Sequence, residues 1–238
     1  EYYRLKPRLR TAAPTEVLDF LKRHEGTAVA DRLRNDWLLE LGRARDWDNF
    51  DRQFPLFVLE DDLQVRCYAL MSRIAKGENV APQARALLLS PPSYGDGCAA
   101  LVADLARTGQ FSADDLVNQL RLAGEMDATG PARRTALLLG ASDTRAAQAV
   151  DFPALAMARG VGTTRAERAI YLGALGRMAR TSVRLATVAR EQNTARLSAD
   201  EQAIGWASIA HAASLALDPE AHTYWSRAAA APLSHEQL

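Results

Sequence analysis

Few side chains in this sequence combine the residue type and the spacing that catalysis or metal binding requires. A zinc site needs nitrogen or sulfur ligands at spacings that bring them to one point. The histidines, which are His24, His211, His222 and His235, fit no such pattern, and neither His-Glu-x-x-His nor Cys-x-x-Cys occurs. We therefore interpret them as surface residues and predict no metal and no cofactor.

An acidic cluster, formed by Glu60, Asp61 and Asp62, could supply the paired carboxylates of a general acid and a general base. The cluster stands directly before an apolar stripe that begins at Leu63. Negative charge at that place complements the dipole of a helix N-terminus. We therefore favour a structural interpretation of the cluster over a catalytic one.

Two glycine-containing segments interrupt the helical pattern. Gly160-Val161-Gly162 lacks the third glycine and the preceding strand of a dinucleotide fingerprint, so residues 158–164 are interpreted as a loop. The Pro-rich segment over residues 90–97 is predicted to be a turn. Neither a Gly-Lys-Ser/Thr phosphate loop nor a Gly-x-Ser-x-Gly elbow is present.

The two cysteines carry more information. Cys67 lies on the apolar stripe with Leu63, Leu70 and Ile74, and Cys98 follows the predicted turn. Their separation is about the length that closes one helical hairpin onto the next, which makes a disulfide geometrically reasonable. Two buried free thiols fit the residues equally well, because cysteine is among the most buried residue types. A bond would indicate an oxidising compartment.

The elements that must position these residues are helices. Of the 238 residues, 48% are hydrophobic, only 7% are aromatic, and the alternation typical of strands is nearly absent. Apolar residues recur instead at helical spacing. The stripes are Val29, Leu33, Trp37, Leu41 and Ala44, then Leu63, Cys67, Leu70 and Ile74, and then Ile170, Ala174, Leu175 and Met178.

Helix boundaries are equally regular. Thr15 and Ser112 stand where helix N-caps are expected, and Ser198 lies three residues before Glu201, the spacing of a capping box. Glycines stand where stripes end: Gly26, Gly77, Gly109 and Gly160. We predict an all-α fold, a superhelical solenoid of roughly ten to twelve short helices stacked as hairpins, forming one segment over residues 1–238.

Charge and hydropathy exclude two classes of function. Lys and Arg together number 29, as do Asp and Glu, so the formal net charge is zero. A nucleic-acid-binding protein normally carries a basic excess, and we expect no such partner. No apolar stretch approaches the roughly 20 residues that span a bilayer, so no transmembrane span is expected.

Several segments in a fixed order are more specific than any one of them. They are Tyr2-Tyr3-Arg4-Leu5, the run from Leu33 to Arg43, Asp46-Trp47-Asp48-Asn49-Phe50, Cys67-Tyr68, Cys98, Tyr224-Trp225-Ser226-Arg227-Ala228 and Leu233-Ser234-His235-Glu236-Gln237-Leu238. Together they resemble the N-terminal superhelical domain of the soluble lytic transglycosylases. Cys67 and Cys98 fall where that family can carry a disulfide, and the resemblance implies that they are bonded.

The resemblance also implies a function. Family members are periplasmic enzymes, and we expect this chain to have lost a signal peptide. They cleave the β-1,4 bond between N-acetylmuramic acid and N-acetylglucosamine in peptidoglycan and release a 1,6-anhydromuramoyl product. Their catalytic glutamate lies in a lysozyme-like domain that follows the superhelix, with a Glu-Ser pair and a Gly-Leu-Met-Gln stretch. Neither occurs here.

We therefore expect a scaffold segment without catalytic residues, which meets glycan strands through the full-length protein. The alternative is a non-enzymatic helical-repeat module that binds protein partners. Association through the helical end around Tyr224 and Trp225 is also expected, because a solenoid fragment can expose an apolar end.

Structural roles are predicted for several residues. Trp37, Trp47, Tyr224 and Trp225 are expected to pack between helices, with Trp37 and Trp47 largely buried. Arg43 and Asp46 are expected to pair at a helix end. Six arginines could contact peptide carboxylates of peptidoglycan, although we favour a solvated face: Arg165, Arg168, Arg177, Arg180, Arg184 and Arg190.

Overall fold

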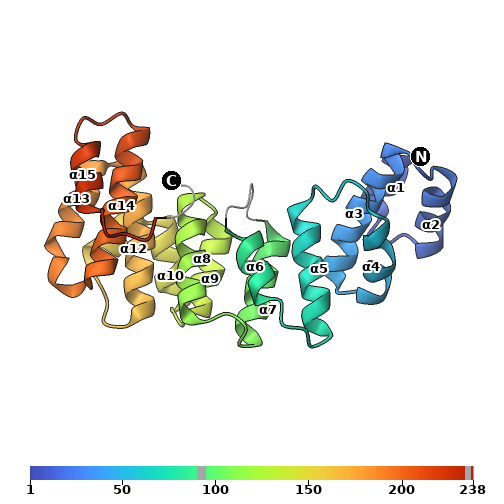
Figure 1. The fold of residues 1–238 in the computed structure, drawn as a ribbon, viewed down its shortest axis with the longest axis horizontal. Coiled ribbons are helices and arrows are strands. Elements are labelled where there is room, and N and C mark those ends of the chain that lie inside the picture. Colours follow the sequence, from blue (N-terminus) through green and yellow to red (C-terminus); the bar gives the residue numbers. More distant parts are fainter. Residues whose placement is uncertain (90–94, 234–236, 238) are drawn as a thin grey trace. The chain divides into compact units, whose positions relative to one another are not determined.

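The computed structural model describes residues 1–89, 95–233 and 237, and every regular element in that part of the chain is helical (Figure 1). This described part of the chain contains fifteen α-helices and three short 3-10 helices. The all-α fold class is thus confirmed, but the number of helices exceeds the ten to twelve expected. The excess comes from helices of four to seven residues, such as α1 and α11, which are too short to show an apolar stripe.

The helices group into two compact units, residues 1–110 and residues 111–238. Each unit has its own internal packing, and each is described by itself below. The expectation that residues 1–238 form one continuous superhelical segment stays a prediction.

The first unit is built around three helices, α3, α5 and α7, of which α5 packs against both of the others. The apolar stripe of α5, from Leu63 to Ile74, is buried as predicted. The helices of this unit are α1 (Tyr2–Leu5), α2 (Pro14–Arg23), α3 (Ala28–Ala44), α4 (Trp47–Gln53), α5 (Leu63–Ala75), α6 (Ala81–Leu87) and α7 (Asp96–Arg107).

The stripe of α3 is buried in its middle and exposed at its ends. Leu33, Trp37 and Leu41 lie in the core, whereas Val29 and Ala44 are exposed. Val29 belongs to the first turn of the helix and Ala44 is its last residue. The stripe therefore shows which face of the helix is buried but not over what length.

The second unit is organised around α12, which packs against α8, α13 and α14. Its stripe of Ile170, Ala174, Leu175 and Met178 is buried as predicted. The helices of this unit are α8 (Ala113–Glu125), α9 (Thr129–Leu138), α10 (Asp143–Asp151), α11 (Pro153–Arg159), α12 (Arg165–Thr181), α13 (Val183–Gln192), α14 (Ala199–Leu215) and α15 (Ala221–Arg227).

Helix N-termini follow local sequence closely, with one exception. Ser112 caps α8 and Ser198 caps α14, each in a capping box, and both predictions are confirmed. The predicted cap at Thr15 is wrong. The N-cap of α2 is Ala13, because Pro14 occupies the first helical position, where its fixed φ suits a helix start.

The loop at residues 158–164 is confirmed except that α11 continues to Arg159, after which Gly160 takes a φ of +74° and ends the helix. The turn predicted over residues 90–97 falls mostly outside the described residues, since 90–94 are not described and α7 begins at Asp96. Ser234, His235, Glu236 and Leu238, which belong to the last resembling segment, also lie outside them.

No helix among the described residues is long and apolar enough to cross a membrane.

Candidate functional site

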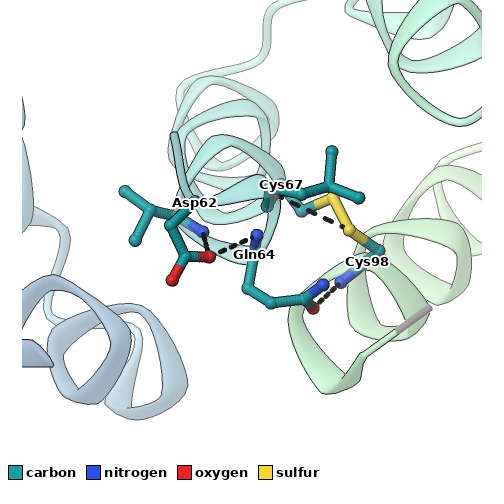
Figure 2. The surroundings of a disulfide bond; sticks show 6 residues. Asp62, Gln64, Cys67 and Cys98 are labelled. Atoms are coloured by element: carbon teal, nitrogen blue, oxygen red, sulfur yellow. Dashed lines mark hydrogen bonds between the residues drawn. A yellow bond between two sulfur atoms is a disulfide. The ribbon is translucent and has the colours of Figure 1, made fainter. Parts of the chain in front are cut away.

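The two cysteines are joined in the structure. The Sγ atoms of Cys67 on α5 and Cys98 on α7 are bonded, with the Cα atoms 5.0 Å apart, and both residues are fully buried. Figure 2 shows Gln64 beside the bond, where its side-chain oxygen accepts a hydrogen bond of 3.1 Å from the backbone N–H of Cys98. A covalent bond and a hydrogen bond therefore hold the N-terminal turn of α7 against α5.

In the acidic cluster of Glu60, Asp61 and Asp62, the last residue has a structural role. Asp62 is the N-cap of α5, and its Oδ1 atom accepts hydrogen bonds from the backbone N–H groups of Gln64 and Val65 (Figure 2). Its other oxygen accepts a hydrogen bond of 3.1 Å from the side-chain amide of Asn35. A carboxylate occupied in this way stabilises a helix start and fixes α5 against α3.

The four aromatic residues expected in packing roles differ in burial. Trp37 lies in the core, but Trp47 is only partly buried, which corrects the expectation of a largely buried ring. Trp47 is the first residue of α4 and packs edge-on against Phe50 of the same helix. Tyr224 and Trp225 are partly buried and pack against the core of the second unit.

The predicted ion pair between Arg43 and Asp46 is wrong. Arg43 pairs instead with Glu40, one turn back on the same helix. Asp46 is the N-cap of α4, where its carboxylate accepts hydrogen bonds from the backbone and the side chain of Asn49. Each of the two side chains is therefore paired with a residue three positions away in the sequence and not with the other.

The six predicted arginines do not form a free basic face. Arg165, Arg168 and Arg177 form ion pairs with Asp114, Glu201 and Asp127. Of the remaining three, Arg184 is exposed, Arg190 is buried, and Arg180 donates to the backbone oxygen of Glu125 at 2.8 Å. Most of these arginines therefore interact with other residues of the second unit.

Arg190 lies in an aromatic setting. Its guanidinium carbon lies 4.5 Å from the ring centre of Trp206, and Arg227 lies 4.6 Å from the same ring. Tyr224 stacks on Trp206 with ring centres 5.9 Å apart. Burial lowers the pKa of the Arg190 guanidinium, and the face of the indole supplies part of the attraction that water would otherwise give.

Histidines and carboxylates form no candidate metal centre in the described part of the chain. No group of three or more His, Cys, Asp or Glu side chains there could hold a metal ion. His222 is exposed, His24 is partly buried beside Glu1, and His235 lies outside the described residues. His211 differs from the surface position expected of it, because it is partly buried in the wall of a groove.

That groove lies in the second unit. It runs over α12, with α8 on one side and α14 on the other, and has a volume of about 390 Å³. Gly173 and Gly176 of α12 form part of its floor, and Ser208 and His211 of α14 lie along one wall. The volume falls within the range of roughly 300–1,000 Å³ typical of small-ligand sites.

Charged groups gather at one end of the groove. Arg121 of α8 donates from Nε to Glu125 Oε1 at 3.0 Å, and the two side chains are 13% and 9% exposed. Arg121 also donates to the backbone oxygen of Pro232 and to the side chain of Gln237. Glu125 Oε2 is buried and makes no hydrogen bond within the described residues.

Sequence reasoning did not select the residues of this groove. The available signal was a pair of glycines, Gly173 and Gly176, inside a helix of 17 residues. Interior glycines destabilise a helix, and when they face one side together they indicate a close approach or an open space. The contribution of Arg121 and Glu125 depends on how α8 meets α12, which no local pattern encodes.

Comparison with known proteins places this fold. A scan against models of protein families finds no match, and a search of curated proteins finds none either. Among solved structures, the chain is similar to an inactive mutant of the lytic transglycosylase Slt from Pseudomonas aeruginosa. The TM-score is 0.56 and the identity 22%, over 94% of this chain and 38% of that one.

Two further structures agree. The 70 kDa soluble lytic transglycosylase of Escherichia coli, and that enzyme class in complex with bulgecin A, each match with a TM-score of 0.54 and 19% identity. They cover 96% of this chain, which spans only 38% of the length of each. At this identity the likeness establishes the fold, and at that level it confirms the resemblance noted in the sequence.

Proposed function

We propose that residues 1–238 are the scaffold portion of a periplasmic lytic transglycosylase. The observation that carries this proposal is the match of nearly the whole chain to a little over one third of solved lytic transglycosylases. The ordered sequence segments that resemble the family's superhelical domain also support it. A helical segment of this kind supplies shape and support, while the chemistry lies elsewhere in the longer protein.

In the reaction implied by the resemblance, a glutamic acid protonates the glycosidic oxygen as the bond to C1 of N-acetylmuramic acid breaks. The glutamate then accepts the proton of the sugar's own 6-hydroxyl, whose oxygen forms the new bond to C1, so that no water is consumed. The scaffold would hold the glycan strand in reach of that glutamate. Periplasmic placement is supported by the buried Cys67–Cys98 bond, which persists in oxidising compartments.

The experiment is digestion of purified sacculi, with released muropeptides identified by mass. Two proteins are compared: residues 1–238 alone, and the product of the complete gene. We expect 1,6-anhydromuropeptides from the complete product and none from residues 1–238. A hydrolytic lysozyme serves as the control, because it releases products of the same strands that are heavier by one water.

If neither protein releases anhydro products, the proposal fails. The fold would then belong to a helical-repeat module without enzymatic activity, and affinity capture on the intact chain would be the next measurement. If residues 1–238 alone release anhydro products, the assignment of this segment as a scaffold fails instead.

A further inference from the structure

The groove over α12 has the features of a ligand site of its own. Its floor is open because Gly173 and Gly176 carry no side chain at the positions that face α8 and α14. A Cβ atom added at Gly176 would lie 3.6 Å from Ser208 Cβ, an ordinary contact, so packing alone does not require glycine there. Alanine would favour the helix by about 1 kcal/mol.

The charge balance of the groove favours an anion. Arg121 and Glu125 neutralise each other through their ion pair. Arg180, at the same end, is exposed and forms no ion pair with any carboxylate in the described part of the chain. Its Nη1 atom donates to the backbone oxygen of Glu125, and its remaining N–H groups suit the two oxygens of a carboxylate.

The other residues that line the groove indicate the chemistry of the uncharged part of the ligand. Side chains such as Ala169, Leu172 and Ile204 make the walls apolar, and no Phe, Tyr or Trp occurs among the described residues that line the groove. Sugars and nucleobases bind well to flat aromatic faces, and the described lining offers none. Glu125 Oε2, buried without a hydrogen-bond partner, offers an acceptor for an N–H donor.

We propose that this groove binds the C-terminal end of a short peptide with small apolar side chains. Arg180 binds the terminal carboxylate, a backbone N–H of the peptide donates to Glu125 Oε2, and the side chains lie over Gly173 and Gly176. The proposal uses only residues of the second unit. It does not depend on the function proposed above, and the sacculus experiment does not test it.

The test uses the intact chain and two probes that differ in one group, N-acetyl-trialanine with a free carboxylate and the same peptide as its C-terminal amide. Binding is followed by NMR through the backbone amide resonances of Gly124, Gly173 and Gly176. We expect the acid to shift these three signals and the amide to bind at least about tenfold more weakly, because a charge-assisted contact is lost.

Two variants with matched controls locate the site. Arg180→Gln is expected to weaken binding of the acid about tenfold. Arg184→Gln makes the same change of charge at an exposed position of α13 and is expected to leave binding unchanged. Gly176→Leu fills the floor and is expected to abolish binding, whereas Gly130→Leu places the same side chain on an exposed position of α9 and has no effect.

The proposal is overturned if the acid shifts none of the three glycine signals at millimolar concentration. Equal affinity for acid and amide would also overturn it, as would equal losses in Arg180→Gln and Arg184→Gln. Should circular dichroism show Gly176→Leu to be unfolded, the acid and amide comparison together with the arginine pair still decides the outcome.

Discussion

Arg45 and Asp104 form a two-point ion pair that joins the C-terminal end of α3 to the last turn of α7. Arg45 Nη1 lies 2.7 Å from Asp104 Oδ2, and Nη2 lies 3.1 Å from Oδ1. The aspartate is buried, while the arginine is half exposed and takes a left-handed backbone conformation with a φ of +57°. The pair links residues 59 positions apart. Arg107, three residues along α7, is a weaker, single-point partner of the same carboxylate, with its Nη2 atom 3.5 Å from Oδ1.

Arg45→Asn is therefore expected to lower the free energy of unfolding by about 2 kcal/mol, because a buried carboxylate loses its main donors. Asparagine tolerates the left-handed backbone, so the change reports the ion pair. Urea denaturation measures it. Arg43→Asn, which breaks only the ion pair with Glu40 within one helix, is expected to cost no more than about 0.7 kcal/mol. Equal losses in the two variants would contradict the prediction.

The double variant Cys67→Ala/Cys98→Ala is expected to lose about 3 to 4 kcal/mol of stability, the chain-entropy estimate for a bond between residues 31 positions apart. Thermal unfolding with and without dithiothreitol provides the measurement. Reductant should destabilise the native chain and leave the double variant unchanged. Free thiols in the native chain under non-reducing alkylation would refute the bond and weaken the periplasmic placement.

Gly42→Ala is expected to destabilise the first unit by about 3 kcal/mol. A Cβ atom at Gly42 on α3 would overlap the ring of Tyr68 on α5, and the ring is buried and cannot move aside. The control is Gly130→Ala on α9, where the added Cβ meets only the end of Arg134 at 3.8 Å. That control should raise stability by up to about 1 kcal/mol. Equal changes in stability in Gly42→Ala and Gly130→Ala would contradict the predicted clash between α3 and α5.

Alkaline pH is expected to destabilise the second unit through Tyr171. Burial raises the pKa of its hydroxyl to about 12, although the side-chain amide of Asn193 donates to it. Below pH 10 both folded and unfolded chains keep the proton, so this contribution to stability is complete. Between pH 10 and about 12 only the unfolded chain ionises at this position, and stability falls as the pH rises.

Urea denaturation at several pH values between 9 and 12 measures that fall. Tyr171→Phe should make the decline shallower, while Tyr3→Phe, at a position that is 86% exposed, should leave it unchanged. An identical slope in the native chain and in Tyr171→Phe would contradict the assignment.

Features that depend on neighbours in the sequence could be predicted well. The N-cap at Ser112 needs only a hydroxyl before a helix, and the capping box at Ser198 needs only a hydroxyl and an acid three residues apart; the structure contains both. The stripe of Leu63, Cys67, Leu70 and Ile74 likewise identifies the buried face of α5, because helical periodicity fixes which side chains share a face.

Features that depend on how helices meet could not be predicted. Arg177 pairs with Asp127 and Arg168 with Glu201, partners that are 50 and 33 positions away in the sequence. Because these partners are so distant, the sequence alone does not show that the arginines form ion pairs. Trp47 has the large apolar side chain typical of a core residue, yet it is only partly buried at the first position of α4. The groove over α12 exists only where α8 and α14 lie beside its glycines.

The bond between Cys67 and Cys98 encloses α6, the remainder of α5 and the segment before α7 in a covalent ring. A protease that cuts anywhere within that ring leaves both products attached to each other. Such a nicked protein would migrate as one band without reductant and as two bands with it. Cleavage of the backbone within this ring would therefore leave its two products covalently joined. After a cut elsewhere in the chain, only non-covalent packing would hold the two products together.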